Sequence, residues 1–258
     1  MPTLAPPEPP TAWTVLSLRP AGQHAGLRGA AARAGWRLLA LSPQRIAPRE
    51  EAGTRHALAA ALAADVVVFT SPNAVRCAAR LHRLRVRSGQ AVLAVGDGTR
   101  RALARLGVDA QAPQRMDSEG LLALPALQRV RGLRVGLVTG IGGRDRLAPA
   151  LQARGARVLR ADVYARLDRR IPGARWDALA GSLAAGQRYW LALSSGDALQ
   201  ACLAQCPPDA REGLLALPVV AASARLVATA REAGFAQVHA ANSARPAALV
   251  DAAREAFG

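Results

Sequence analysis

The order of apolar and polar positions in residues 134–166 predicts a strand, a turn, a helix and a second strand in succession. Residues 135–138 are continuously apolar, which is typical of a strand buried on both faces. The helix that follows places on one face the apolar residues Leu147, Ala150 and Leu151. Gly155 is a helix-ending signal, and apolar and polar residues then alternate in a strand ending at Tyr164. Such a unit usually pairs its two strands in parallel through a right-handed crossover.

The turn inside this unit is rich in glycine, with Gly140, Gly142 and Gly143. A turn at this point leaves several backbone N–H groups unpaired above the carboxyl end of the sheet. Unpaired N–H groups that converge in this way bind anions. We therefore expect an anion-binding loop here.

The same pattern occurs near the N-terminus, displaced by 120 positions. There a strand at residues 14–18 precedes the dipeptide Arg19-Pro20, a helix ends at Gly35, and a strand follows at residues 36–41. The matched pairs are Gly22 with Gly142, Leu27 with Leu147, Gly35 with Gly155, and Leu38 with Val158. One structural unit is thus used twice in the chain.

Further pairs of strand and turn repeat between the two halves. The strand at residues 66–69 opens into Thr70, Ser71, Pro72 and Asn73, and the strand at residues 189–193 opens into Ser194, Ser195, Gly196 and Asp197. The strand at residues 91–95, with a helix ending at Gly107, matches the strand at residues 219–222 with the helix after Ser223. Ser71 fits a helix N-cap, with proline in the first turn after it.

These repeats are interleaved rather than consecutive, which predicts a discontinuous domain arrangement. We expect one domain from residues 12–44 and 168–258 and an inserted domain from residues 45–167, with crossings near residues 43–48 and 167–172. Each is predicted to be an α/β domain with a doubly wound parallel sheet. Ligands of such sheets collect at the carboxyl ends of the strands, so facing turns of two domains would form a cleft lined with N–H groups and hydroxyls.

The chain carries a formal net charge of +16, and all 34 basic residues are arginine. The absence of lysine excludes Schiff-base chemistry and a P-loop lysine. A positive field attracts nucleic acids, acidic membranes or anionic small molecules, although arginines spread over solvated helix faces would give the same total. Aromatic residues make up only 3% of the chain, too few for a base-stacking platform, so we expect no nucleic-acid partner.

The three cysteines, Cys77, Cys202 and Cys206, cannot all pair and lack the spacing of a zinc site. We therefore expect buried thiols in a reducing cytoplasm, and no metal.

The proline-rich residues 1–11 are expected to be a disordered tail rather than a signal peptide. No stretch approaches the roughly 18 apolar residues of a membrane span, so we expect no membrane partner.

Several common kinds of site are incomplete in this sequence. The partial dinucleotide fingerprint at the glycine turn lacks its third glycine, which is replaced by Asp145. The turn Ser194-Ser195-Gly196 follows leucine and is no serine-hydrolase elbow, and the four histidines stand singly. What remains are hydroxyls, arginines, amide-rich turns and Tyr164, which are groups suited to binding carboxylates.

Four motifs together carry a resemblance to a known family. They are Phe69-Thr70-Ser71-Pro72-Asn73-Ala74-Val75, Ala94-Val95-Gly96 with Thr99, Gly140-x-Gly142-Gly143-Arg144 with Leu147, and Val163-Tyr164. In order and spacing they resemble the uroporphyrinogen-III synthase family of tetrapyrrole biosynthesis, and the match extends over nearly the whole chain. The resemblance implies two flavodoxin-like domains joined by two crossing segments, with the active site between them.

The resemblance also implies a function. Members of the family are cofactor-free lyases that close linear hydroxymethylbilane to uroporphyrinogen III, expelling water and inverting the last pyrrole ring. We therefore expect a cytoplasmic, monomeric enzyme of haem biosynthesis with a polycarboxylate substrate, no cofactor, and at most a transient contact with the preceding pathway enzyme. The positive net charge suits such a substrate. The alternative is a non-enzymatic protein that binds an anionic small molecule in the same cleft.

Carried over by position, the resemblance implies a set of substrate-binding residues. They are Arg19, Thr70, Ser71, Asn73, Gly96, Gly140, Gly142, Gly143, Arg144, Ser194, Ser195 and Ser223. Simpler explanations are also open. Ser71 could be a helix cap with no role in binding, and the glycines could form a tight connection with no chemical role. After Ser223 the chain departs from the family pattern, because Arg225 and Leu226 stand where some members have threonine.

Tyr164 and Thr99 are the catalytic residues that the resemblance implies. Tyr164 matches a tyrosine proposed in the family to help the hydroxyl group leave, and a phenol that keeps its proton at neutral pH can donate it. Thr99 matches a threonine that faces the cleft. The simpler explanations are a buried, hydrogen-bonded tyrosine at a strand end and a surface threonine in a first helical turn.

Overall fold

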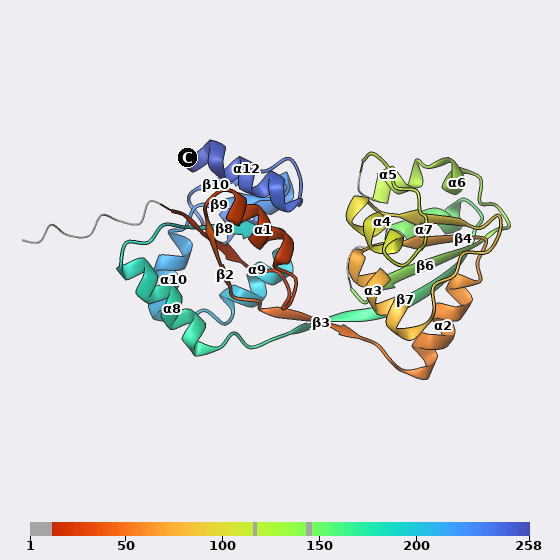
Figure 1. Cartoon of the computed structure of the whole chain (residues 1–258), viewed down its shortest axis with the longest axis horizontal. Helices are drawn as coiled ribbons and strands as arrows, with labels where there is room; N and C mark the ends of the chain where they lie inside the picture. The colour runs from red at the N-terminus through yellow and green to blue at the C-terminus, as the bar shows by residue number, and fades with distance from the viewer. Residues whose placement is uncertain (1–11, 116–117, 143–145) are drawn as a thin grey trace, which may run out of the picture. The chain divides into compact units, whose positions relative to one another are not determined.

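The computed structural model describes residues 12–115, 118–142 and 146–258, so the proline-rich residues 1–11 lie outside it. The chain forms two compact units, one of residues up to Arg45 together with Leu167–Gly258, and one of Ile46–Arg166. It passes from one unit to the other within strand β3 (Gln44–Pro48) and again within strand β7 (Arg157–Asp168) (Figure 1). These two strands are neighbours in one sheet.

The first unit contains a five-stranded parallel sheet in the order β10-β9-β8-β1-β2. Its strands are β1 (Thr14–Ser17), β2 (Arg37–Ala40), β8 (Tyr189–Leu193), β9 (Val219–Ala221) and β10 (Val238–Ala240). Numbered within the unit from the β2 edge, this is the 2-1-3-4-5 order of flavodoxin-like folds. Strands β1 and β8 are entirely buried because helices cover both faces of the sheet.

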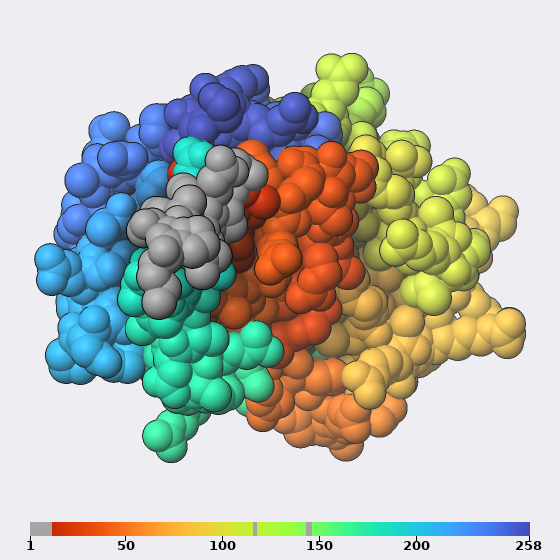
Figure 2. All heavy atoms as spheres, turned by 60° about the vertical axis from the view of Figure 1, so that its left-hand side comes forward, coloured from red at the N-terminus to blue at the C-terminus, as the bar shows by residue number. Residues whose placement is uncertain are grey.

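Two groups of helices cover this sheet. On one face, α1 (Ala25–Arg33) packs beside the C-terminal helix α12 (Pro246–Phe257), and Figure 2 shows the dark-blue surface of α12 next to the red and orange N-terminal segment. Their shared core includes Leu27, Trp190 and Leu249. The other face is covered by α8 (Gly173–Ala184), α9 (Gly196–Leu203), α10 (Pro208–Leu215) and α11 (Ala224–Glu232).

The second unit also contains a five-stranded sheet, in the order β3-β7-β6-β4-β5. Its remaining strands are β4 (Val66–Phe69), β5 (Ala91–Ala94) and β6 (Arg134–Gly140). Strand β4 pairs in parallel with β5 and β6, and β6 pairs in parallel with β7. The ladder between β6 and β7 shifts register between Thr139 and Gly140, at the carboxyl end of β6.

Helices cover both faces of this sheet as well. On one face lie α2 (Ala52–Leu62), α3 (Pro72–Leu81) and α4 (Asp97–Ala104), which pack around Phe69 and Ala161. On the other lie α5 (Ser118–Leu122), α6 (Pro125–Gln128) and α7 (Leu147–Ala153), around Leu137. Gly136 permits a close approach of α2 to β6, since a Cβ atom there would lie 2.0 Å from the carbonyl oxygen of Ala61.

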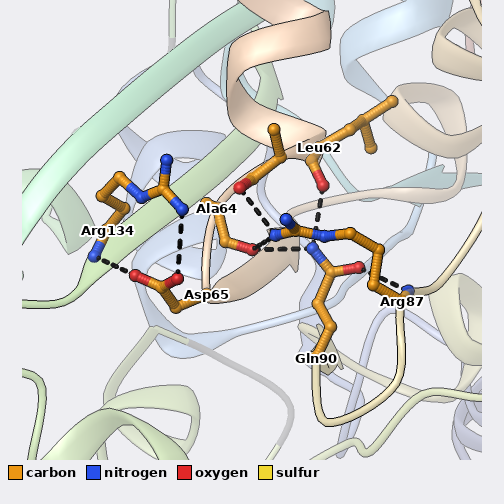
Figure 3. Close-up of polar contacts among 7 residues, drawn as sticks. Leu62, Ala64, Asp65, Arg87, Gln90 and Arg134 are labelled. Carbon is orange, nitrogen blue, oxygen red and sulfur yellow. Dashed lines mark hydrogen bonds and ion pairs between the residues drawn. The ribbon is translucent and has the colours of Figure 1, made fainter.

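Polar side chains tie the end of α2 to the loop before β5 (Figure 3). The Gln90 amide donates to two carbonyl oxygens at this helix end, at 2.8 and 2.7 Å, and the Arg87 guanidinium donates to one of them at 2.9 Å. Beside them Asp65 accepts hydrogen bonds from the backbone and the side chain of Arg134, at 2.8 and 3.3 Å. These contacts satisfy carbonyl groups that have no partner within the helix.

The predicted fold class is confirmed, because both units are built on parallel sheets covered by helices on two faces. The internal repeat extends to backbone conformation. Gly22 and Gly142 both have a φ of 76°, and Gly35 and Gly155 have φ values of 75° and 82°. Each pair thus occupies the left-handed region that favours glycine.

The structure differs from the predicted elements at the two crossings between the units. Residues 43–48 were expected only to be a crossing, and Gln44–Pro48 form strand β3. Strand β7 continues beyond Tyr164 to Asp168. Both differences have one cause. Strands β3 and β7 are neighbours in one sheet, so the polar residues of each can form a strand by pairing with the other.

No helix in the described residues is long and apolar enough to cross a membrane. Within the same residues, no cluster of histidine, cysteine and carboxylate side chains is arranged to hold a metal ion. All three cysteines are free thiols, and burial raises the pKa of Cys202 to about 12. That thiol is therefore a packing group and no nucleophile.

Candidate active site

The second unit has a pocket at the carboxyl end of its sheet, with a volume of about 220 Å³. Its walls come from the ends of β4, β6 and β7 and the start of α7. The lining residues are Thr70, Ser71, Val95, Ser118, Leu137, Thr139, Gly140, Gly142, Leu147, Arg160, Tyr164 and Arg166. Five of the predicted site residues, namely Thr70, Ser71, Gly140, Gly142 and Tyr164, are brought together here.

Two threonine hydroxyls meet at one wall of the pocket. Strands β4 and β6 are paired in register, with Phe69 opposite Val138, so the next residues of the two strands are also neighbours. Thr70 Oγ1 donates to Thr139 Oγ1 at 2.8 Å, and the Thr70 backbone N–H donates to the Val138 carbonyl at 3.1 Å. The pairing therefore fixes a pair of hydroxyl groups at the pocket wall.

Ser71 links the N-terminus of α3 to Tyr164. Ser71 is the N-cap of α3, and its Oγ accepts a hydrogen bond from the backbone N–H of Ala74 at 3.0 Å. The same oxygen lies 3.2 Å from the Tyr164 hydroxyl. The Tyr164 hydroxyl thus lies next to the N-terminus of α3, which is the positive end of the helix dipole.

The ring of Tyr164 lies against the backbone of Gly140. A Cβ atom on Gly140 would come within 2.4 Å of the Tyr164 ring carbon Cζ. The register shift between β6 and β7 leaves Val163 unpaired and places Gly140 opposite Tyr164, and the Ile141 N–H donates to the Tyr164 carbonyl at 2.8 Å. Tyr164 is only 3% exposed, so its ring is part of the core while its hydroxyl reaches Ser71.

The charged residues of the pocket all come from β7. Arg160 holds the carboxylate of Asp162 with Nε and Nη2 at 3.0–3.1 Å. On the other side of Tyr164, the guanidinium carbon of Arg166 lies 5.8 Å from the centroid of the tyrosine ring. Arg160 and Arg166 give this small pocket two guanidinium groups.

Other predicted residues of this unit lie outside the pocket lining. Asn73 accepts a hydrogen bond from Arg76, one turn further along α3. Gly96 is the N-cap of α4, and its carbonyl accepts from the backbone N–H of Thr99 at 3.0 Å. Thr99 is only 1% exposed, since α4 packs on α3, so it is not a surface threonine. The predicted residues Gly143 and Arg144 lie outside the described residues.

In the first unit the predicted serines follow strands β8 and β9. Ser195 and Ser223 are the N-caps of α9 and α11, and each side chain accepts from the backbone N–H three residues later, at 3.3 and 3.4 Å. Ser194 directly follows β8. The carboxyl edge of this sheet therefore carries helix N-termini with hydroxyl caps, as does the edge of the second unit.

Arg19 follows β1 at the same edge of the first unit. Its Nη2 donates to the Ala244 carbonyl at 3.1 Å, while Nε is buried without a hydrogen-bond partner. Burial lowers the pKa of this guanidinium. The partly buried guanidinium of Arg19 thus lies at the carboxyl edge of the sheet, next to the strand end.

His24 was not singled out from the sequence, yet it is the centre of a buried polar cluster beside Arg19. Its Nδ1 lies 3.0 Å from Ser17 Oγ and its Nε2 lies 2.7 Å from Ser42 Oγ. Burial, followed by the charges of nearby arginines, lowers the pKa of His24 to about 4. The imidazole is therefore neutral at physiological pH, with one ring nitrogen donating and the other accepting.

A larger hollow of about 700 Å³ lies in the first unit and contains none of the predicted residues. It is lined by Trp13, Trp36 and Arg188, which precede strands β1, β2 and β8, and by the end of α12. Open sheets of this kind bind ligands at the carboxyl ends of their strands, and this hollow is at the amino ends. The smaller pocket around Tyr164 is the candidate active site.

Sequence reasoning missed four polar residues of that pocket, Ser118, Thr139, Arg160 and Arg166. Arg160 had a visible signal, since it stands four residues before Tyr164 in the predicted alternating strand, whereas Arg166 lies beyond the predicted end of that strand. Thr139 and Ser118 had none, because only the strand order and the packing of α5 bring them to the pocket.

Comparisons with known proteins agree with this geometry. The family model described as "Uroporphyrinogen-III synthase HemD" matches residues 26–251. The uroporphyrinogen-III synthase of Salmonella typhimurium is 35% identical over 166 residues, covering 62% of this chain and 65% of the relative. That of Escherichia coli is 34% identical over 140 residues, covering 52% and 54%. The chain thus spans slightly less than two thirds of the length of the first relative and about half of the second.

Solved structures show the same fold over nearly the whole chain. A mutant uroporphyrinogen III synthase from Thermus thermophilus has a TM-score of 0.60 at 21% identity, covering 95% of this chain and 99% of that one. The uroporphyrinogen-III synthetase of Helicobacter pylori has a TM-score of 0.58 at 14% identity, covering 94% and 99%. The family model matches residues 26–251, which is well over half of this chain, and the chain therefore belongs to the uroporphyrinogen-III synthase family.

Proposed function

We propose that this chain is an active uroporphyrinogen-III synthase, which closes hydroxymethylbilane to uroporphyrinogen III with loss of water and inversion of the last pyrrole ring. The observation that carries the proposal is the Tyr164 hydroxyl, held against Ser71 at the N-terminus of α3 in a pocket with two guanidinium groups. A proton donor beside cationic groups is what the dehydration of a polycarboxylate requires. Membership of the family supports the same conclusion.

The reaction begins with the departure of a hydroxyl group from the hydroxymethyl carbon. The C–O bond breaks, the pyrrole ring supplies the electron pair that replaces it, and the oxygen leaves as water after taking a proton from Tyr164. Ser71 then stabilises the tyrosine oxygen, because its hydroxyl can donate to Tyr164 while the same oxygen accepts from Ala74. An electron-rich pyrrole assists this departure strongly, so positioning of the chain accounts for most of the catalysis.

Thr70 and Thr139 are proposed to bind a substrate carboxylate or ring N–H at the pocket wall. Their hydroxyls already share one hydrogen bond at 2.8 Å, which leaves the Thr139 proton free to rotate toward a ligand. Each also retains acceptor capacity. The pair is thus a fixed polar contact that orients the substrate without contributing charge.

In the first unit, Arg19, Ser194, Ser195 and Ser223 are proposed to bind further carboxylates. Arg19 has a buried Nε without a partner, and the serines stand at helix N-termini. Asn73, Gly96 and Thr99 keep their proposed roles as well, although none of them lines the Tyr164 pocket. Thr99 is buried, so a catalytic role would require α4 to move.

A non-enzymatic protein that binds an anionic small molecule would use the same groups. The two functions differ in turnover: a binder saturates at one equivalent of ligand, whereas the enzyme converts many. Incubation of the purified chain with freshly prepared hydroxymethylbilane, at a hundredfold excess of substrate, separates them. The proposal predicts that all of the substrate is consumed faster than in a protein-free control, and consumption of the excess substrate at the protein-free rate would support the binder.

We further propose that the chain acts as a monomer in the cytoplasm and without a cofactor. Light scattering on a sizing column at several concentrations tests the oligomeric state. A specific activity that rises with protein concentration would contradict a monomeric enzyme.

A further inference from the structure

We propose that Arg160 and Arg166 bind two different substrate carboxylates on either side of Tyr164, and that Asp162 is the positioning residue that orients Arg160. The inference rests on the proposed function, since it assigns the groups of the substrate that the pocket recognises. It adds three residues of β7 for which the family resemblance implied no role.

Residues 158–162 of β7 alternate, and Ala161 is fully buried in the core beneath α2 and α3. Val163 and the ring of Tyr164 both lie in that same core, because the register shift opposite Gly140 interrupts the alternation at Val163. The alternation turns Arg160 and Asp162 away from that core. Arg160, Tyr164 and Arg166 all line one pocket. At about 3.3 Å per residue, the Cα atoms of the two arginines are roughly 20 Å apart. The two guanidinium groups are also held by different partners, Arg160 by the carboxylate of Asp162 and Arg166 by the ring of Tyr164, so we assign each arginine its own carboxylate.

The contact between Arg160 and Asp162 fixes the direction of a guanidinium group. Two nitrogen atoms of Arg160 hold both oxygens of the carboxylate, at 3.0–3.1 Å. The side chains are 31% and 26% exposed, and ion pairs of that kind stabilise a fold only weakly. Because Arg160 lines the pocket, the consequence of the pair is orientation at the pocket wall.

Asp162 also reduces the net positive charge at this wall by one. A site that selected its ligand by charge alone would therefore be better without Asp162. The presence of the carboxylate favours a site selected by geometry, in which a planar guanidinium is aimed at a planar acceptor. Removal of the Asp162 charge therefore has opposite expected effects on binding, tighter if charge selects the ligand and weaker if geometry does.

Arg166 is held in a different way. Its guanidinium carbon lies 5.8 Å from the centroid of the Tyr164 ring, within the range of a cation–π contact. The side chain is exposed, so its position depends on that ring rather than on an anion. A carboxylate bound by Arg166 would lie close to Tyr164 and thus to the reacting group.

The test is a binding titration with uroporphyrin III, a stable aromatic polycarboxylate that cannot react. Arg160→Ala and Arg166→Ala should each weaken binding about tenfold or more, the effect of one lost charge-assisted hydrogen bond. The matched control is Arg157→Ala, which removes the same charge from the exposed amino end of the same strand and should change affinity less than twofold. Equal effects of all three variants would overturn the inference in favour of general electrostatic attraction.

Asp162→Asn tests the positioning role. If Asp162 orients Arg160, this variant binds uroporphyrin III more weakly although the site has gained a positive charge, and combining it with Arg160→Ala adds little further loss. Tighter binding by Asp162→Asn would overturn the role. A purely structural role would lower the melting temperature without changing the affinity of the folded protein.

Turnover distinguishes this inference from the proposed function. With hydroxymethylbilane, the arginine variants should raise KM by a larger factor than they lower kcat. If the chain binds uroporphyrin III through these arginines but forms no uroporphyrinogen, the proposed function is wrong and the inference about the arginines still holds. If the chain turns over normally after both arginines are replaced, the inference is wrong and the proposed function still holds.

Discussion

The aromatic ring of Tyr164 lies on the backbone of Gly140, at a point where no side chain fits between them. A Cβ atom on Gly140 would lie 2.4 Å from Cζ and 2.6–2.7 Å from two further ring carbons. The glycine turn therefore has a function besides presenting N–H groups, because it provides the space in which the tyrosine is packed. This relationship joins a predicted binding residue to a predicted catalytic residue.

Gly140→Ala should displace the Tyr164 ring and lower both stability and rate. Overpacking of this kind costs about 1–3 kcal/mol of the free energy of unfolding, measured by urea denaturation. The double variant Gly140→Ala/Tyr164→Ala removes the clash. Its loss in the free energy of unfolding should therefore be smaller than the sum of the losses in the two single variants. Strict additivity would show that the ring does not lie where the structure places it.

Tyr164→Phe should lower the turnover rate several-fold or more, while the product remains isomer III. The variant loses the proton donor and its contact with Ser71, but keeps the ring that fills the space above Gly140. The chain has only one other tyrosine, Tyr189, which is buried in the core of the first unit. Tyr189→Phe is therefore the matched control, and equal rates for both variants would remove the Tyr164 hydroxyl from the mechanism.

His24 should make the protein less stable in mild acid. Burial lowers its pKa from 6.5 to about 4, so between those values the unfolded chain binds a proton that the folded chain does not. Stability therefore falls as the pH decreases from 6.5 to 4, by on the order of 3 kcal/mol, and this contribution stays constant below pH 4. Urea denaturation of the wild type and of His24→Gln across this range measures the effect, and parallel pH profiles would contradict it.

Gly136→Ala should be among the most destabilising small substitutions in the second unit. Its new Cβ atom would lie 2.0 Å from the Ala61 carbonyl oxygen, and a backbone atom at the end of α2 cannot rotate away. We expect a loss of about 3 kcal/mol, or failure to fold. Gly53→Ala, in the same helix and facing open space, should instead stabilise the protein by about 0.5 kcal/mol. Equal stabilities of the two variants would refute the close approach of α2 to β6.

The fold was predictable because its signals are local. Ser71 and Pro72 follow an apolar strand and mark the start of a helix, and α3 begins at Pro72 with Ser71 as its cap. The left-handed glycines of the repeated turns are equally local features. Strand β3 was missed because its polar and proline residues depend on β7 as a neighbour, which the sequence of residues 44–48 does not reveal.

The site was predictable only in part, for a related reason. Thr139 reaches Thr70 because β6 lies beside β4, and Gly140 reaches Tyr164 because the β6–β7 ladder shifts register. Neither strand order nor a register shift can be read from single residues. His24 forms its cluster with Ser17 and Ser42, which come from the ends of different segments of the chain. Contacts between residues that are far apart in the sequence can be found only from a structure.

The most direct test of the account is the isomer composition of the product formed from freshly prepared hydroxymethylbilane. After oxidation to the porphyrins, chromatography separates the type I isomer of simple ring closure from the type III isomer, in which the last ring is inverted. The account predicts mostly type III with the wild-type chain and type I in the protein-free control. Type I alone at the control rate, from folded protein, would contradict it.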